Sequence, residues 1–331
     1  MPSVHFLNVA PGDCTIIRHS SGHVTMVDIC DGNAESKVKK AKLADTTRIK
    51  PLGHFRMCEY PTNPIQYLND LGISGIFRFI LTHPDMDHMD GLNALVEKIG
   101  ISNFWDTSVR RDSPEFGDRS PYDEADWDCY ENLRNGKKSG VKSLTKLAGS
   151  RFKFANIGED DQAGGDGLYI LAPDTDLVRN ASDGGDINDG SFVLLYRSSG
   201  GRILLPGDAH DSTWEYVLTH YKKDVANCSV MIAPHHGRDS DRSFDFLDKI
   251  NPKLTLFGCA PSEHLAYEEW NRRNLEFITS NQAGNIVLEI DSTKISVYIE
   301  NETFERTKNP YNKIKNSHGY IWLEDILKTD E

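Results

Sequence analysis

The sequence of 331 residues contains no apolar run long enough to cross a bilayer as a helix, which takes roughly 18 residues. Its first residues also lack a basic region followed by a long apolar stretch, so no signal peptide is expected and the expected location is the cytoplasm. Internal repeats and low-complexity segments are missing as well. With 38% hydrophobic and 26% charged residues, the composition is that of a globular protein with a substantial core.

Cysteine pairs with a metal-binding spacing are absent. None of the six cysteines forms a Cys-x-x-Cys motif, which argues against a thiolate zinc knuckle and against a disulfide framework. We therefore expect reduced thiols that mostly contribute to packing. The sequence also has no Gly-x-Ser-x-Gly motif and no cysteine beside a suitable base, so a serine or cysteine hydrolase is not expected.

The chain also lacks a surplus of positive charge, because its formal net charge is −13. Non-specific binding to nucleic acid draws its affinity from Lys and Arg that displace counterions, and an acidic chain gains little from this effect. Bound divalent cations would change the local balance, however, because they neutralise clustered carboxylates. The overall charge therefore does not exclude a phosphate-containing substrate.

The order of the expected elements indicates an α/β fold. The chain opens with short paired strands, and strands and helices then alternate in two successive halves. Two such halves predict a layered α/β sandwich. The expected strands lie at residues 4–9, 14–18, 23–29, 77–82, 168–173, 191–197, 202–206, 230–234, 253–258, 286–290 and 295–300, and the clearest helices at 64–71, 92–99 and 212–221.

Composition divides the chain into one domain over residues 1–300 and a charged C-terminal tail over residues 301–331. Within the domain, residues 106–165 are more polar than their surroundings and combine an acidic-aromatic part with a basic helical part. We expect this segment to be an insertion that covers one side of the domain. The alternative is a solvated excursion without a role.

Four potential metal ligands lie within six residues, directly after the expected buried strand at residues 77–82. They are His83, Asp85, Asp87 and His88. Imidazole and carboxylate groups are the ligands of zinc, manganese and iron sites. An acidic turn exposed to water is the alternative interpretation, but two histidines and two aspartates at this spacing favour a metal site.

Potential ligands also follow two later strands. Gly207-Asp208 comes after one, and the residue pair His235 and His236, followed by Gly237, comes after the next. A single Asp or His after a strand is more often a turn former or a helix cap, but here three strand ends present such residues. Asp208 is expected to bridge two cations, because a carboxylate offers two oxygens and a negative charge.

These three motifs together resemble the metallo-β-lactamase superfamily. The HxDxDH pattern at residues 83–88 is the most specific of them, and the opening VHFLNVAPGDCTIIR…MVDIC resembles the first hairpins of one branch, the hydrolase domain of competence-type DNA-uptake (ComEC-like) proteins. The resemblance covers residues 4–300. It implies a four-layer αββα sandwich and two divalent metal ions, with zinc as first choice and manganese as the alternative because Asp85 replaces the commoner histidine.

The resemblance also implies a division of the ligands. His83 and Asp85 would hold one metal ion, Asp87 and His88 would hold the second, and Asp208 would bridge them. One histidine of the adjacent pair would complete the set. The sequence leaves open which one, because the other could orient a ligand or a phosphate from behind.

Further residues are candidates for contacts around the ligands. Asp28, which ends a strand, Asn188 and Arg238 are candidates for support of the ligands or for substrate contacts. Asn188 lies where many superfamily members have a separate histidine, and a plain turn is its alternative role. His264 matches a late active-site histidine and is a candidate ligand or proton donor, with a surface position as the alternative. The other histidines are expected to be structural or exposed: His5, His19, His23, His54, His210, His220 and His318.

The expected activity is hydrolysis by a hydroxide that two metal ions activate. Asp87 is placed to accept a hydrogen bond from this hydroxide. Either His264 or the histidine of the pair at 235 and 236 that is not a ligand could protonate the leaving group. The resemblance implies a phosphodiester substrate, either nucleic acid or a nucleotide, for which arginines after the late motifs offer phosphate contacts: Arg238, Arg242, Arg272 and Arg273. The alternatives are hydrolysis of a small ester, lactone or phosphocholine ester, and a non-catalytic scaffold with a structural metal site. No oligomeric state follows from the sequence.

Overall fold

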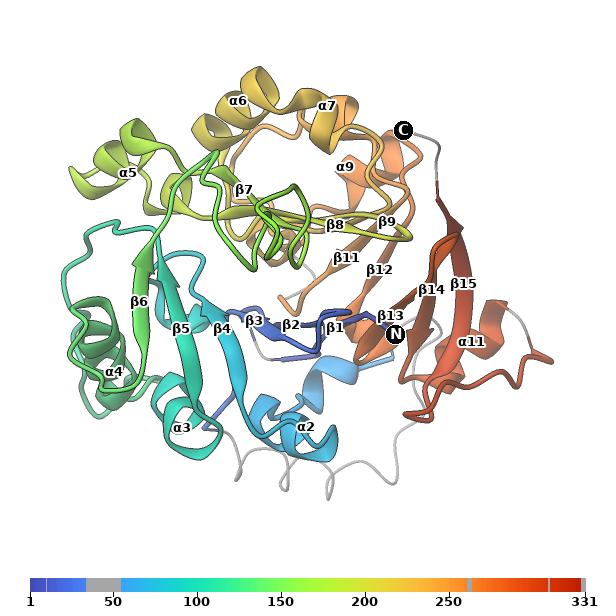
Figure 1. Cartoon of the computed structure of the whole chain (residues 1–331). Coiled ribbons are helices and arrows are strands. Elements are labelled where there is room, and N and C mark those ends of the chain that lie inside the picture. The colour runs from blue at the N-terminus through green and yellow to red at the C-terminus, as the bar shows by residue number, and fades with distance from the viewer. Residues whose placement is uncertain (10, 34–54, 261–263, 309, 329–331) are drawn as a thin grey trace.

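The computed structural model describes residues 1–9, 11–33, 55–260, 264–308 and 310–328. Two β-sheets face each other, and helices cover the outer face of each sheet (Figure 1). The helices α2, α3 and α4 lie against one sheet, and α6, α7 and α9 lie against the other. The expected α/β sandwich with four layers is thus confirmed.

The larger sheet has nine strands in the order β15-β14-β13-β1-β2-β3-β4-β5-β6. The pairs from β15 to β3 are antiparallel, and the pairs from β3 to β6 are parallel. Its strands are β1 Ser3–Phe6, β2 Thr15–Arg18, β3 Val24–Val27, β4 Ile76–Ile80, β5 Ile101–Asp106, β6 Lys142–Thr145, β13 Ile286–Ile290, β14 Lys294–Ile299 and β15 Ile321–Leu327.

The smaller sheet has six strands in the order β12-β11-β10-β9-β8-β7. Strands β7 to β9 pair antiparallel, and β9 to β12 pair parallel. Parallel neighbours end at the same edge of a sheet, so the loops after β9 and β10 lie side by side. The strands are β7 Leu168–Ala172, β8 Val193–Ser198, β9 Gly201–Leu205, β10 Val230–Ile232, β11 Leu254–Phe257 and β12 Phe277–Thr279.

Helices and short 3-10 segments connect these strands. The α-helices are α2 Pro64–Asp70, α3 Leu92–Lys98, α4 Glu124–Arg134, α5 Thr175–Ser182, α6 Asp211–His220, α7 Lys222–Val225, α8 Leu247–Ile250, α9 Tyr267–Arg272, α10 Ser280–Ala283 and α11 Glu302–Lys308. The 3-10 segments are η1 Met57–Glu59, η2 Met86–His88, η3 Ile187–Gly190 and η4 Pro234–Gly237.

Three hydrophobic clusters fill the three spaces between the four layers. Successive residues of a strand point to opposite faces of its sheet. In β4, Ile80 accordingly joins the cluster between the sheets, while Phe79 joins the cluster under α2, α3 and α4. In β9, Ile203 faces the other sheet, while Leu204 joins the third cluster, which also contains Trp214 of α6. Successive apolar residues of one strand thus contribute to the hydrophobic clusters on both faces of its sheet.

The expectation of a separate charged tail after residue 300 is not met. Helix α11 and strand β15 occupy much of this segment, and β15 extends the larger sheet by pairing with β14. Phe304, Ile321 and Ile326 are buried in the cluster between the sheets. Residues 106–165, expected as an insertion, likewise contribute α4 and the edge strand β6. The single domain over residues 1–300 stays a prediction.

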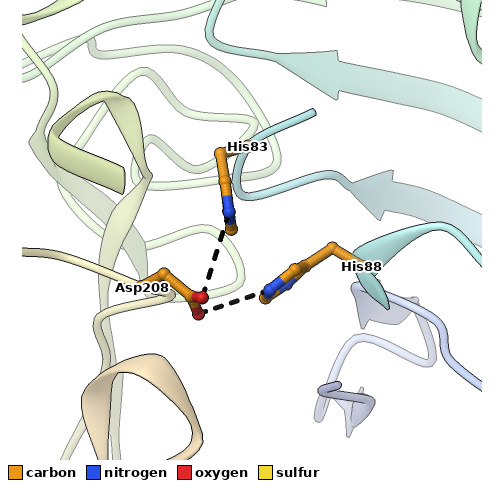
Figure 2. Close-up of side chains that lie close together, drawn as sticks. All are labelled: His83, His88 and Asp208. Carbon is orange, nitrogen blue, oxygen red and sulfur yellow. Dashed lines mark ion pairs between the residues drawn. The ribbon is translucent and has the colours of Figure 1, made fainter. Parts of the chain in front are cut away.

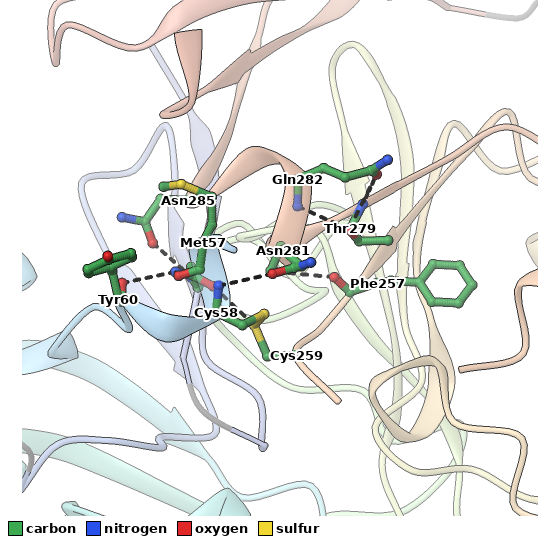
Figure 3. The surroundings of a disulfide bond; sticks show 11 residues. Met57, Cys58, Tyr60, Phe257, Cys259, Thr279, Asn281, Gln282 and Asn285 are labelled. Atoms are coloured by element: carbon green, nitrogen blue, oxygen red, sulfur yellow. Dashed lines mark hydrogen bonds between the residues drawn. A yellow bond between two sulfur atoms is a disulfide. The ribbon is translucent and has the colours of Figure 1, made fainter. Parts of the chain in front are cut away.

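The prediction that all cysteines are reduced is wrong. Cys58 and Cys259 form a disulfide that joins η1 to the loop after β11, across 201 residues of sequence (Figure 3). No spacing in the sequence predicts this pair, because only the fold brings the two residues together. The other four cysteines are free and buried, as expected. In the part of the chain that the structure describes, no helix is long and apolar enough to cross a membrane.

Candidate metal centre

The predicted ligands lie where strand ends of the two sheets meet. His83 follows β4 of the larger sheet, whereas Asp208 follows β9 and His236 follows β10 of the smaller one. Two backbone hydrogen bonds join these ends: Phe192 N–H donates to the Thr82 carbonyl at 2.9 Å, and His235 N–H donates to the Gly207 carbonyl at 3.1 Å. The topology therefore brings together the three motifs that the sequence singled out.

Asp208 lies between His83 and His88 (Figure 2). Its Oδ1 is 3.3 Å from His88 Nε2, and its Oδ2 is 4.0 Å from His83 Nε2. Both imidazole side chains are fully buried, and the Asp208 side chain is nearly so. The two carboxylate oxygens thus face different histidines, an arrangement compatible with a bridging ligand.

His236 closes the other side of the cluster. Its Nε2 is 3.4 Å from Asp87 Oδ2 and 3.6 Å from Asp208 Oδ2, and its Nδ1 is 3.2 Å from Asp13 Oδ1. The carboxylate of Asp13 therefore holds one ring nitrogen while the other faces the cluster. Asp13 lies in the opening hairpin and is not among the site residues predicted from the sequence. A single Asp in a turn is common, so its position alone does not indicate a role.

Gly237 allows His236 to take this place. The backbone of Gly237 has φ of +88°, and a Cβ there would lie 2.1 Å from Cδ1 of Phe257. A side chain would meet both a strained backbone and the ring behind it. Glycine after the two histidines is therefore a geometric requirement of the loop.

Asp28 contacts His88 on the side away from Asp208. His88 Nδ1 donates to Asp28 Oδ2 at 2.8 Å, and Thr82 donates to both carboxylate oxygens, from its backbone N–H at 2.8 Å and from its hydroxyl at 2.7 Å. A carboxylate behind a histidine sets the tautomer and the ring orientation of a metal ligand. Nε2 of His88 is then left to face Asp208.

Several buried ligand atoms of the cluster are left without a hydrogen bond. Within the described residues these atoms include Nε2 of His83, His88 and His236 and Oδ1 of Asp208. Leaving a buried polar atom unpaired costs about 1–3 kcal/mol. The residues group into sets whose ligand atoms all lie within 4.8 Å of one another, among them His83, His88, Asp208 and Asp87, His88, His236. Such a donor set fits one or two divalent cations.

The charges of the cluster also fit cation binding. Burial lowers the pKa of His88, but the carboxylates of Asp208, Asp28 and Asp87 outweigh this effect and raise that pKa well above its usual value. For His236, burial acts the same way, and Asp208 and Asp13 nevertheless raise the pKa to about 10. For these two histidines, unlike His83 and His235, whose pKa burial lowers to about 4, cation binding should therefore release protons.

Asp85 contacts both the cluster and an arginine at its rim. Its Oδ2 is 3.7 Å from His83 Nε2, but its Oδ1 forms an ion pair with Arg111. Arg111 comes from the segment expected as an insertion, so this segment reaches the rim of the site. Sequence reasoning did not single out Arg111, because nothing near it in the sequence resembles a binding motif.

The two histidines after β10 both reach the cluster. His235 Nε2 is 3.6 Å from Asp208 Oδ2, the same separation that His236 Nε2 shows. Behind His235 lies His210, whose Nε2 is 2.9 Å from His235 Nδ1. His210, expected to be a structural or exposed residue, therefore contacts a candidate ligand. His210 is the N-terminal cap of α6, and only the fold shows that its side chain contacts His235.

Three further residues were predicted to belong to the site, namely Asn188, Arg238 and His264. Asn188 is half-buried in η3, where its backbone N–H bonds to Asp186, and Arg238 is half-buried beside Gly237. His264 is exposed, and its carbonyl accepts a hydrogen bond from Asp239 N–H. Residues 261–263 before it, and His54, lie outside the described residues. The roles of Asn188, Arg238 and His264 stay predictions.

Arg242 is not a phosphate contact on a solvated face. Its side chain is buried and donates to the carbonyls of Ala209, Pro234 and Arg238. It therefore braces the loop of the two histidines from within. Arg272 and Arg273 are paired with acidic neighbours, whereas Arg111 is paired with the candidate ligand Asp85.

Comparisons with known proteins give distant likenesses. No family model matches the chain. No curated protein sequence matches it either. Among solved structures, a metallo hydrolase (Igni18) from the archaeon Ignicoccus hospitalis is 12% identical, with 87% of this chain and 100% of that chain covered and a TM-score of 0.44. Tm1679, described as a metal-dependent hydrolase of the β-lactamase superfamily, is 11% identical, with 88% and 100% covered and a TM-score of 0.46.

A third solved structure is the unliganded yeast PDE1. It is 11% identical, with 84% of this chain and 98% of that chain covered and a TM-score of 0.44. Similarity at this level does not assign an activity to the chain. The function has to be argued from the residues of the site itself.

Proposed function

We propose that this protein is a metal-dependent hydrolase of the metallo-β-lactamase superfamily that cleaves phosphodiesters, either in nucleic acid or in a nucleotide. One observation supports this most directly: a buried cluster of histidines and aspartates whose ligand atoms face one another without hydrogen bonds. The motif pattern, closest to the ComEC-like branch, supports the same assignment from the sequence.

In this proposal, six side chains hold two divalent cations, with zinc as first choice and manganese as the alternative. His83 and Asp85 hold the first cation, and Asp208 bridges the two. The second cation is held by Asp87, His88 and His236, whose ligand atoms lie within 4.8 Å of one another. Two such cations activate water and polarise the bond under attack.

The remaining roles belong to residues of the rim. Asp87, partly exposed at the cluster, orients the attacking water. Arg111 and Arg238 bind the phosphate, because guanidinium groups match phosphate oxygens in geometry and charge. His264, on the segment that pairs with Arg238, donates the proton to the leaving group.

The smaller substrates remain the alternative. A small ester, a lactone or a phosphocholine ester needs the same activated water and would differ in the contacts made by the rim. A scaffold with a purely structural metal site is the non-catalytic alternative. The ion pair between Arg111 and Asp85 favours phosphate, since it places a guanidinium beside a ligand, where a substrate oxygen would bind.

The test compares the wild type with the double variant Asp87→Ala/His88→Ala and with His220→Ala, an exposed histidine on α6, as control. Bound metal is measured by elemental analysis, and cleavage with bis-p-nitrophenyl phosphate, single-stranded DNA and a chromogenic lactone. We expect about two metal ions and cleavage of the phosphodiesters alone. The double variant should lose both properties, and the control should lose neither.

Other outcomes distinguish the alternatives. Cleavage of the lactone alone would replace the phosphodiester substrate by a small ester. Metal binding without cleavage of any of the three substrates would favour the scaffold. A wild type that binds no divalent metal would overturn the proposal as a whole.

A further inference from the structure

His235 is the residue of the site whose role the motif pattern leaves open. In the proposed ligand set, the first cation has only one imidazole, His83, and its second ligand, Asp85, forms an ion pair with Arg111. Meanwhile the Nε2 of His235 lies 3.6 Å from Asp208 Oδ2, as near to the bridging carboxylate as that of His236. Its ring is therefore in reach of a cation that Asp208 would share.

The backbone of the loop is bent so that both histidines reach Asp208. His235 has φ of 53° and ψ of 47°, and His236 has φ of 57° and ψ of 9°, so both are left-handed. This conformation is unfavourable for a residue with a side chain. Arg242 holds the loop in place through the carbonyls of Pro234 and Arg238. Strain of this kind persists where the surrounding structure enforces it, most often at functional sites.

A chain of hydrogen bonds fixes the tautomer of His235. Asp186 Oδ2 lies 2.5 Å from Nδ1 of His210, so this nitrogen is the donor and the His210 Nε2, when the ring is neutral, is an acceptor. His210 Nε2 in turn lies 2.9 Å from His235 Nδ1, which must then donate. The hydroxyl of Ser240, 3.1 Å from the same Nδ1, can accept as well. Nε2 of His235 is left with its lone pair directed toward Asp208.

We propose that His235 is a ligand of the first cation, and that His210 and Asp186 are positioning residues that hold it in the binding tautomer. This inference rests on the proposed function, because it requires that the cluster binds metal. It assigns both histidines of the loop to metal binding, one for each cation. It also gives a role to three residues from separate elements: the loop after β10, the N-terminal cap of α6 and the cap of η3.

The experiment measures cation binding and not activity. Metal-free full-length protein is titrated with Co²⁺, and the number of bound ions, their dissociation constants and the visible absorption of bound Co²⁺ are recorded. The variants are His235→Ala, His210→Ala and His210→Gln, with His220→Ala as the matched control because it lies exposed at the other end of α6. Thermal unfolding of each metal-free variant establishes that it is folded.

We expect His235→Ala to retain one tightly bound ion and to lose the other from the tight-binding range. His210→Ala should weaken the same ion by about 10–100-fold, because residues behind a ligand have effects of this size. His210→Gln should weaken it less, since the side-chain oxygen can accept from His235 Nδ1. The absorption of the affected Co²⁺ should change, and His220→Ala should match the wild type.

Two results would overturn the inference. If folded His235→Ala, or folded His210→Ala should the first variant not fold, binds two ions with wild-type constants and an unchanged spectrum, His235 is not a ligand. The proposed function would survive that result, because wild-type metal binding and phosphodiester cleavage would be intact. If the wild type itself binds no Co²⁺, both the inference and the proposed function fail.

Discussion

Asp28 shows how a single carboxylate can orient a candidate metal ligand from behind. We expect Asp28→Asn to weaken cation binding by about 10–100-fold, because the amide cannot supply the charge that orients His88. The dissociation constant for Zn²⁺, measured by competition with a chelator, tests this. Asp183→Asn, at an exposed carboxylate, is the control. Equal constants for Asp28→Asn and the wild type would show that Asp28 has no such role.

At the same scale, the sequence predicts which candidate ligands meet, but not the residues behind them. His83, Asp208 and His236 lie just after strands, His88 lies in the loop that begins at His83, and strand ends converge in a layered sheet fold, so their meeting could be predicted. Asp13, His210 and Arg111 lie in a turn, a helix cap and a loop. Their partners are far away in sequence, so no local pattern predicts the roles of these three residues.

Among the elements, β15 is one of the strands that the sequence did not predict. Its residues lie in the segment expected to be a charged tail. The strand contains an irregularity opposite Val297 and Tyr298, so the buried residues Ile321, Leu323 and Ile326 do not keep a period of two. A broken period looks like neither a strand nor a helix, which explains the wrong prediction. The regular strands β4, β8 and β9 were predicted correctly.

Two adjacent residues of β15 test whether this strand belongs to the core. Ile326 is 6% exposed and Leu327 is 65% exposed. We expect Ile326→Asp to lower the free energy of unfolding by about 3 kcal/mol or more, because it removes buried apolar surface and buries an unpaired charge. Leu327→Asp should change it by less than about 0.5 kcal/mol. Urea denaturation measures both, and equal losses would contradict the position of β15.

The disulfide between Cys58 and Cys259 concerns the whole molecule, because it closes a loop of most of the chain. Cross-links of this kind contribute about 2–5 kcal/mol to stability, chiefly by restricting the unfolded state. We expect the double variant Cys58→Ser/Cys259→Ser to lose an amount in this range. Reducing agent should lower the melting temperature of the wild type and leave that of the double variant unchanged. Six reactive thiols in unfolded, unreduced wild type would show that the bond does not form.

Acid should destabilise the molecule through two buried histidines. Burial lowers the pKa of His5 to about 3 and that of His19 to about 4, from 6.5. Below pH 6.5 these two histidines bind protons in the unfolded chain but stay neutral in the folded chain. The free energy of unfolding therefore falls as the pH falls, by up to about 1.4 kcal/mol per pH unit for each histidine. Unfolding free energies between pH 5 and 7 measure this slope.

The double variant His5→Gln/His19→Gln provides the comparison. It should show a shallower slope than the wild type over the same pH range, whatever its absolute stability. His220→Gln, at an exposed position, should keep the wild-type slope. A double variant with an unchanged slope would mean that these two histidines do not remain neutral in the folded protein.

The most direct test of the whole account is the metal content of the purified protein, determined by elemental analysis after exposure to zinc and removal of unbound ions. The buried cluster of His83, His88, Asp208 and His236 predicts about two zinc ions per chain. It also predicts their loss in Asp87→Ala/His88→Ala and their retention in His220→Ala. A correctly folded wild type that retains no zinc or manganese would contradict the proposal that this cluster binds divalent metal ions.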